Sequence, residues 1–255
     1  MAASKYPAQI PRVAFFTDTY NEINGVALTS RQLTAFAARR GYPFVCIRGA
    51  SRDLQLKEGS TTHIEIERGR FAFGLDKDLH HDPLLWRHAR RISAGLREFR
   101  PDLIHVVSPG DVSEVGVYIA KKMKLPLAIS WHTNLHEFGA MRLAKLLSWM
   151  GSETRAAVER GSERGILEAV LAFYRMGDVL YAPNEELVEM LRKRTGKPVF
   201  LMKRGIDTDL YSPGKRTAAD GFLRIGYVGR TTPEKNVRFL RDLEIGLRQR
   251  DISPF

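Results

Sequence analysis

The 255-residue sequence is poor in cysteine and in long apolar runs. Its single cysteine, Cys46, excludes an intramolecular disulfide, and the apolar run "FVCIRG" around it favours a buried hydrophobe over a nucleophile. No run approaches the roughly 20 apolar residues that a membrane-spanning helix needs. The N-terminal "MAASKYPAQIPR" lacks the apolar core of a secretory signal, so we expect a cytoplasmic protein.

Signatures of three common classes of site are also missing. No G-x-S-x-G elbow supports a serine hydrolase, and "TDTYNEING" stands where a dehydrogenase would carry G-x-G-x-x-G. His132 and His136 lie four residues apart in "SWHTNLHEF", but Thr133 replaces the glutamate of the zinc-protease pattern. Glu137 could add a ligand, yet no cysteine cluster is nearby. We therefore expect neither a metal nor a cofactor.

An excess of basic side chains gives a net charge of +11, from 40 Lys and Arg against 29 Asp and Glu. Such an excess suits phosphate-bearing ligands, nucleic acid or an anionic membrane surface, and charge alone does not choose among them. Motifs for nucleic-acid binding are absent, so we expect no nucleic-acid partner. The Arg-rich stretch 86–100 is interpreted as the solvated face of a helix.

Short apolar runs alternate with amphipathic stretches through residues 1–205. Strands about thirty residues apart with helices between them predict a parallel sheet flanked by helices, which is a Rossmann-like α/β domain. The predicted strands are 12–18, 43–49, 102–109, 126–132, 178–183 and 198–205, and the predicted helices are 25–41, 84–99, 113–124 and 184–196, the last with Asn184 as N-cap. Residues 61–73 predict extended structure with a turn, and 140–177 predict helix with breaks at Gly151, Gly161 and Gly165.

A second unit is expected after residue 205. Residues 206–221 are rich in Pro, Gly, Asp and Thr, which predicts an interdomain linker. Residues 222–255 predict a strand, a loop and a helix, the first βα unit of another α/β domain. One such unit cannot bury its own apolar face, so we expect this second domain to be incomplete here.

Ligands of open α/β sheets bind at the carboxyl ends of strands, beside helix N-termini. In "FFTDTYNEINGV" Asp18 ends a strand and Gly25 opens the next helix, where glycine allows close backbone approach and free N–H groups attract phosphate. In "YVGRTTPEKNVRF" Lys235 falls at the positive end of a predicted helix, which costs stability. An anion between Arg230 and Lys235 would offset that cost and predicts a diphosphate clamp; two solvated basic residues are the plainer alternative.

Together, "FFTDTYNEINGV", "SWHTNLHEF", "KRGIDTDLYSP" and "YVGRTTPEKN" resemble the retaining GT-B glycosyltransferases of glycosyltransferase family 4, a group that includes phosphatidylinositol mannosyltransferases and other glycolipid transferases. The resemblance runs from about residue 12 to about residue 245, in order. It implies two Rossmann-like domains facing a cleft, with the acceptor mainly on the first and a nucleotide-sugar donor mainly on the second.

The resemblance also implies roles for single residues. Gly25 matches the glycine whose backbone approaches the donor phosphates, and His132 matches the histidine that closes on the transferred sugar. Arg230 and Lys235 match the clamp on the donor diphosphate. In such enzymes the donor phosphate itself assists a front-face displacement, so no protein nucleophile is needed, and no metal is implied.

Asp18 and Tyr20 would then lie on the acceptor side of the cleft. A lipid or saccharide acceptor is implied, and the donor sugar and nucleotide stay open. The basic charge and the stretch 141–176, with leucines beside Arg142 and Lys145, favour peripheral association with an anionic membrane at its inner face; a packed core and cleft wall is the equal alternative.

The departure from the family lies in the second domain. The family continues for well over a hundred residues and carries a paired-Glu motif there, so we expect these 255 residues to be an inactive fragment or the product of a disrupted reading frame. The alternative is a non-catalytic, glycosyltransferase-like binding or interaction protein.

Overall fold

The computed structural model describes residues 10–76, 79–132, 152–215, 226–228 and 236–250, with the side chains of 75, 76, 79 and 152–163 left aside. The chain forms two compact units, Met1–Gly205 and Ile206–Phe255.

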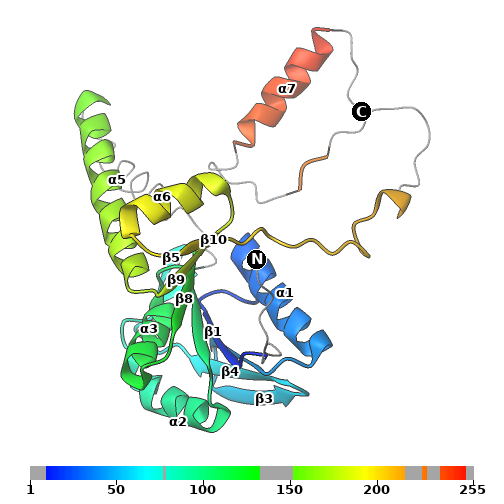
Figure 1. The fold of residues 1–255 in the computed structure, drawn as a ribbon. Coiled ribbons are helices and arrows are strands. Elements are labelled where there is room, and N and C mark those ends of the chain that lie inside the picture. The colour runs from blue at the N-terminus through cyan, green and yellow to red at the C-terminus, as the bar shows by residue number, and fades with distance from the viewer. Residues whose placement is uncertain (1–9, 77–78, 133–151, 216–225, 229–235, 251–255) are drawn as a thin grey trace, which may run out of the picture. The chain divides into compact units, whose positions relative to one another are not determined.

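The first unit is built on an eight-stranded sheet with the order β10-β9-β8-β7-β1-β2-β4-β3 (Figure 1). All neighbours are parallel except β3, which runs antiparallel to β4. Its strands are β1 (Val13–Thr17), β2 (Phe44–Ala50), β3 (Leu54–Glu58), β4 (Thr61–Glu67), β7 (Leu103–Val107), β8 (Leu127–Ser130), β9 (Val179–Ala182) and β10 (Val199–Leu201). From β1 the chain first builds β2, β4 and β3 on one side and then crosses to β7 on the other, so the topological switch point lies between β1 and β7.

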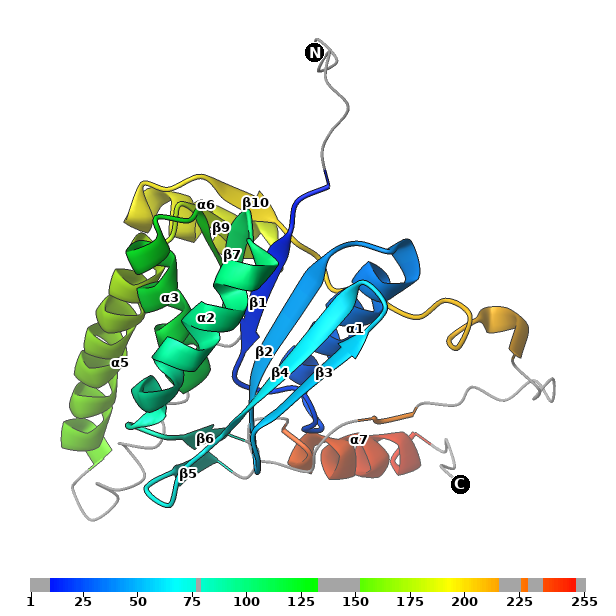
Figure 2. The same cartoon turned by 90° about the horizontal axis from the view of Figure 1, so that it is seen from below.

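Helices cover both faces of this sheet, as Figure 2 shows. They are α1 (Gly25–Arg40), the 3₁₀ turn η1 (Leu85–His88), α2 (Ala89–Phe99), α3 (Asp111–Met123), α5 (Ser152–Arg175) and α6 (Glu185–Thr195). Because side chains alternate along a strand, Ala14 and Phe16 of β1 join one buried cluster while Phe15 joins another with Ala37 of α1. The predicted α/β architecture, a parallel sheet between helical layers, is confirmed.

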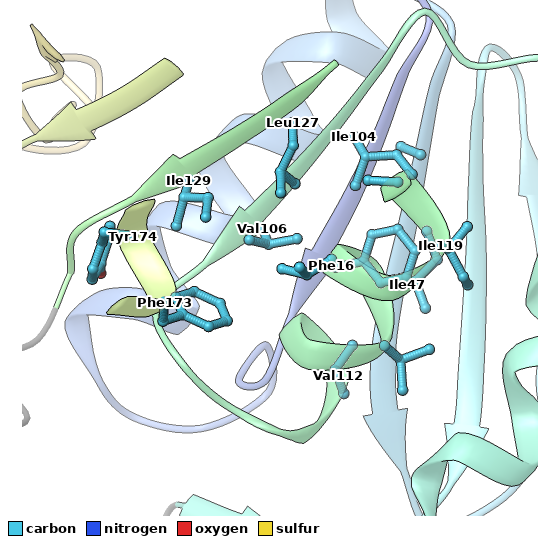
Figure 3. Packing of buried hydrophobic residues seen from close by; sticks show 14 of the residues in the cluster. Phe16, Ile47, Ile104, Val106, Val112, Ile119, Leu127, Ile129, Phe173 and Tyr174 are labelled. Atoms are coloured by element: carbon cyan, nitrogen blue, oxygen red, sulfur yellow. The ribbon is translucent and has the colours of Figure 1, made fainter. Parts of the chain in front are cut away.

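The larger cluster packs α3 and the C-terminal half of α5 against the sheet (Figure 3). Helix α3 lies very close to the strands because Gly116 has no side chain. A Cβ atom there would lie 2.8 Å from Cγ of Phe16 and 2.8 Å from Cγ1 of Val106, both buried. The glycine therefore sets the distance between helix and sheet.

Local sequence rules explain how two helices begin and end. The Asn24 side chain accepts a hydrogen bond from the Ala27 N–H at 2.8 Å, and the Asn184 side chain accepts one from Leu187 at the same distance. Gly41 ends α1 in the left-handed region at φ 67°, where glycine is favoured. The predicted start of a helix at Gly25 and the predicted Asn184 cap are both confirmed.

Several predicted boundaries are wrong. Helix α5 runs through Gly161 and Gly165 without a break, because each interior glycine costs only about 1 kcal/mol, which the packing of the C-terminal half of the helix can offset. The predicted strand 198–205 ends at Leu201, and the predicted helix 84–99 divides into η1 and α2. Strand β3 and the hairpin of β5 (Phe73–Asp76) and β6 (Leu79–His81) were not predicted as strands. Gly151 lies outside the described residues.

In the second unit the described residues include a 3₁₀ turn, η2 (Pro213–Lys215), and one α-helix, α7 (Arg238–Arg248). The predicted strand 222–229 lies mostly outside the described residues, and residues 226–228 are not in a strand. The linker and the domain that should follow it stay predictions. None of the helices that the structure describes combines the length and the apolar character needed to span a bilayer.

Candidate functional site

The site is built where strands β1, β7, β8 and β10 end, at the carboxyl edge beside the switch point. Asp18 follows β1, the turn at Ser108 follows β7, His132 follows β8 and Arg204 follows β10. Ser108 has φ 37°, an uncommon conformation for a residue other than glycine, of the kind that gathers at functional sites. The topology thus brings together side chains from four segments that are far apart in the sequence.

The Asp18 carboxyl is buried and takes part in hydrogen bonds at the start of α3. Its Oδ1 accepts the Val112 N–H at 2.8 Å, and its Oδ2 lies 2.6 Å from Oγ of Ser113. The carboxyl fills the space beside Gly110, where a Cβ atom would meet it at 2.3–2.5 Å. Burial, and then the nearby charge of Asp111, raise the pKa of Asp18 to about 8.

A neutral Asp18 fits the hydrogen bonds around it. Oγ of Ser113 also lies 2.5 Å from the Val107 carbonyl, and a hydroxyl has one proton to donate. If Asp18 carries a proton on Oδ2, it donates to Ser113, which in turn donates to Val107. The chain of hydrogen bonds is then complete without a charge in the core.

Asp111 takes the opposite ionisation state. Burial alone would raise the pKa of Asp111, but Arg68 outweighs it and holds that pKa below its usual range. Nε of Arg68 lies 3.0 Å from Oδ2 and Nη2 lies 3.1 Å from Oδ1, a bidentate pair, and Nη2 also donates to the Asp18 carbonyl at 3.1 Å. The Asp82 N–H donates to Oδ2 of Asp111 at 2.9 Å. Two adjacent buried acids are thus held in different protonation states.

Tyr20 turns towards β2 and β4. The Arg48 guanidinium carbon lies 4.0 Å from the centre of the Tyr20 ring, and Arg48 pairs with Glu65 at 2.7 Å. The Tyr20 N–H donates to the Glu22 carboxylate at 2.6 Å. Its phenol is half-buried, and burial raises its pKa. The acceptor-side roles of Asp18 and Tyr20 stay predictions.

His132 lies at the end of β8 with its ring almost completely enclosed, since the residue is 9% exposed. Its Nε2 is buried and has no hydrogen-bond partner among the described residues. Burial, and then the charge of Arg204, lower the pKa of His132 to about 4, so the ring is neutral at pH 7. This buried nitrogen can therefore still accept or donate a hydrogen bond.

Gly25, the first residue of α1, lies beside Arg204. A Cβ atom on Gly25 would lie 2.3 Å from Nη1 of Arg204, and Nη2 of Arg204 donates to the His132 carbonyl at 3.1 Å. Helix α1 has no acidic residue in its first turn. The structure therefore brings two of the predicted site residues, Gly25 and His132, to the same arginine.

The remaining predicted positions cannot be placed in the same way. Arg230 and Lys235 lie outside the described residues, as do His136 and Glu137, so the diphosphate clamp stays a prediction. Within the ranges that the structure describes, no group of three or more His, Cys, Asp or Glu side chains could hold a metal ion.

Three residues of the site were missed from the sequence. Asp111 had a readable signal, since in "VVSPGDVSE" it opens a helix just after a strand, as Asp18 ends one. Arg204 stands in the segment "KRGIDTDLYSP", but nothing in that segment shows where its side chain goes. Arg68 had no signal, because its partner lies on a distant segment.

The fold and this edge define a Rossmann-like α/β domain whose candidate site brings Gly25, His132 and Arg204 together. The sequence matches the family described as Glycosyltransferase Family 4 over residues 23–210, and the chain belongs to that family. This membership confirms the resemblance to glycosyltransferase family 4, and the parallel sheet with its helices forms a Rossmann-like α/β domain.

Its relatives include two proteins named GDP-mannose-dependent alpha-mannosyltransferase. The one from Corynebacterium glutamicum is 24% identical over 244 residues, which covers 91% of this chain and 54% of that protein. The one from Mycobacterium tuberculosis is 26% identical over 160 residues, or 60% of this chain and 38% of that protein. A glycosyltransferase structure from Rickettsia africae aligns with a TM-score of 0.46 at 12% identity, over 96% of this chain and 50% of that one. The chain thus spans about half the length, or less, of the curated relatives that it matches.

Proposed function

We propose that the protein serves the transfer of a hexose from a nucleotide-sugar to a lipid or saccharide acceptor, with retention of the anomeric configuration. Mannose carried by GDP is the first donor to test, because two relatives are named for it. The observation that carries the proposal is the enclosed, neutral His132 at the carboxyl edge where α/β folds bind ligands, whose Nε2 has no hydrogen-bond partner among the residues described.

The ionisation of His132 suits sugar binding better than proton abstraction. A ring with a pKa of about 4 is a weak base at pH 7, but its nitrogens still donate and accept hydrogen bonds. We assign it a hydrogen bond to a hydroxyl of the donor sugar, which fixes the position of the reacting carbon. Retention then comes from front-face attack assisted by the donor phosphate.

The leaving diphosphate calls for positive charge and N–H donors. The first turn of α1 lacks acidic residues, so its N-terminus is free to attract an anion at Gly25. Arg230 and Lys235 are the further cations that the family pattern supplies. Donors arranged in this way stabilise charge that develops on the leaving group.

A completed chain tests the proposal. Residues 1–255 are joined to the C-terminal remainder of the Corynebacterium glutamicum relative, and the release of GDP from GDP-mannose is measured with lipid and saccharide acceptors. We expect transfer, and we expect His132→Ala to reduce its rate by about two orders of magnitude, as the loss of a key transition-state contact does. Acceptor binding should survive the substitution.

Three outcomes count against parts of this proposal. Transfer at the unsubstituted rate by His132→Ala would refute the role of the histidine. A folded completed chain that binds acceptors but transfers no hexose would favour the non-catalytic alternative. Ordinary turnover by residues 1–255 alone would refute the expectation that essential parts of the donor site are missing.

We further propose that the acceptor lies at an anionic membrane surface, which the net charge of +11 supports. Co-sedimentation with vesicles containing anionic lipid should exceed that with neutral vesicles and should fall as salt is added. Absence of binding to both kinds of vesicle would contradict this part of the proposal.

A further inference from the structure

We propose that Arg204 is a phosphate-binding residue of the donor site, which it forms together with Gly25 and the N-terminus of α1. The inference rests on the proposed function only for the identity of the ligand, a sugar nucleotide. The phosphate site, defined as the Arg204 guanidinium and the first turn of α1, follows from the geometry and should bind a diphosphate of any kind.

The first support is the position of the guanidinium. Nη1 of Arg204 lies where a side chain on Gly25 would be, 2.3 Å from the ideal Cβ position, so the group rests on the backbone at the start of α1. The segment after β10 follows α1 further, since a Cβ on Gly205 would lie 3.7 Å from Oε1 of Gln32. The missing side chain at Gly25 thus makes room for a cation of the same chain.

The second support is electrostatic. A positive side chain at the positive end of a helix is unfavourable, and α1 offers no acidic residue in its first turn to relieve it. Among the residues that the structure describes, no carboxylate forms an ion pair with Arg204. Within the same described ranges, the hydrogen bond of the guanidinium runs from Nη2 to the His132 carbonyl. Nη1 is therefore left to bind an anion.

The third support comes from the neighbouring histidine. His132 is 9% exposed and its Nε2 has no hydrogen-bond partner in the part of the chain that the structure describes, which is a second and independent sign that a polar ligand belongs here. Its ring lies close enough to Arg204 for the positive charge of the guanidinium to lower the pKa of the histidine. Arg204 thus donates from Nη2 to the backbone of His132, the proposed sugar-binding residue, and offers Nη1 to the phosphate. In this way it sets the distance between the sugar site and the phosphate site of a donor.

Inorganic pyrophosphate is the probe that isolates this inference. Its binding to residues 1–255 is measured by calorimetry at fixed ionic strength for the unsubstituted chain and for R204Q, R204K and K203Q. Lys203 is the matched control, because it is the adjacent exposed cation and its side chain forms no hydrogen bond or ion pair with the described residues. We expect R204Q to weaken binding about tenfold or more, as the loss of a charged hydrogen bond does, R204K to weaken it less, and K203Q to change it less than about twofold.

Equal effects of R204Q and K203Q would overturn the inference, because binding would then reflect net charge alone. Unchanged affinity in R204Q, or no pyrophosphate binding by the unsubstituted chain, would overturn it as well. Gly25→Ala should displace the guanidinium and weaken binding, and the double variant with R204Q should lose less than the two single losses combined.

The proposed function can fail separately. Pyrophosphate binding that depends on Arg204, together with no hexose transfer by the completed chain, would support the phosphate site and refute the proposed transferase activity. Transfer by the completed chain, together with unchanged pyrophosphate affinity in R204Q, would retain the transferase and reject the role of Arg204.

Discussion

Replacing Asp18 with Asn should remove a pH dependence from the stability of the protein. The buried Asp18 keeps its proton in the native state until about pH 8, whereas in the unfolded chain the same group has its ordinary pKa of 3.8. Asparagine has nearly the same shape, accepts the same N–H groups at Oδ1 and can donate from Nδ2 to Ser113. It therefore imitates the neutral acid.

The sign and size follow from proton linkage. Between pH 4 and pH 8 the native state holds one proton more than the unfolded state at Asp18, so the free energy of unfolding falls as the pH rises. One proton corresponds to about 1.4 kcal/mol per pH unit, which gives about 2.5 kcal/mol between pH 5 and pH 7. The stabilisation is complete below the unfolded pKa and is lost as the pH rises through the folded one. The lowered pKa of Asp111 acts in the opposite direction and below pH 4.

Urea unfolding followed by circular dichroism at pH 5, 6 and 7 measures the effect. The stability of Asp18→Asn relative to the unsubstituted chain should rise with pH by about 2.5 kcal/mol over that range. Asp209→Asn is the control, since Asp209 is exposed and its side chain has no contact among the described residues. A stability difference for Asp18→Asn that is constant from pH 5 to pH 7 would refute a protonated Asp18.

Three further predictions concern helix packing, capping and the site. Gly116→Ala should lower the free energy of unfolding by about 1–3 kcal/mol, because the added methyl group overpacks against β1 and β7. Gly95→Ala in α2 should raise the free energy of unfolding by about 0.5–1 kcal/mol, because its Cβ would lie 3.7 Å from the nearest atom, at ordinary contact distance. Urea titrations of the two variants measure both effects. Asn184→Ala should cost about 1 kcal/mol in the same assay, because the N–H at the start of α6 loses its acceptor, and no loss would show that the cap contributes nothing. Arg204→Gln should raise the pKa of His132 from about 4, since a neighbouring positive charge is removed, and a ¹⁵N NMR titration of the ring that finds no rise would contradict the contact.

The sequence-based predictions succeeded where the rule is local. The predicted N-cap Asn184 caps its helix because its side chain reaches the N–H three residues on, and Asp18 and His132 follow strands that end at the same edge because parallel strands share one direction. The predictions failed where contacts with residues distant in the sequence determine the local structure. Helix α5 is continuous because one of its faces packs on the core, and β3 is mostly exposed, so it shows no apolar pattern of its own.

The contacts within the site are the part that sequence reasoning could not supply. The pairing of Arg68 with Asp111 and the hydrogen bond from Arg204 to His132 join segments that are remote along the chain. No spacing rule relates such residues, because their proximity depends on the order of the strands in the sheet. The types of residue at the strand ends were readable, whereas their bonding partners were not.

The central place of β1 in the sheet also has a consequence for synthesis. On one side Val13 pairs with Phe44, but on the other it pairs with Leu103, so half of the hydrogen-bonding groups of β1 have no partner until β7 emerges from the ribosome. Until then Phe16 also lacks the β7 and α3 side chains that bury it. A nascent chain of this length displays an open strand edge and an uncovered aromatic ring, which are the features that promote aggregation and that chaperones bind. During translation from β2 to α3, the nascent chain therefore exposes a strand edge and an aromatic side chain that the folded protein covers.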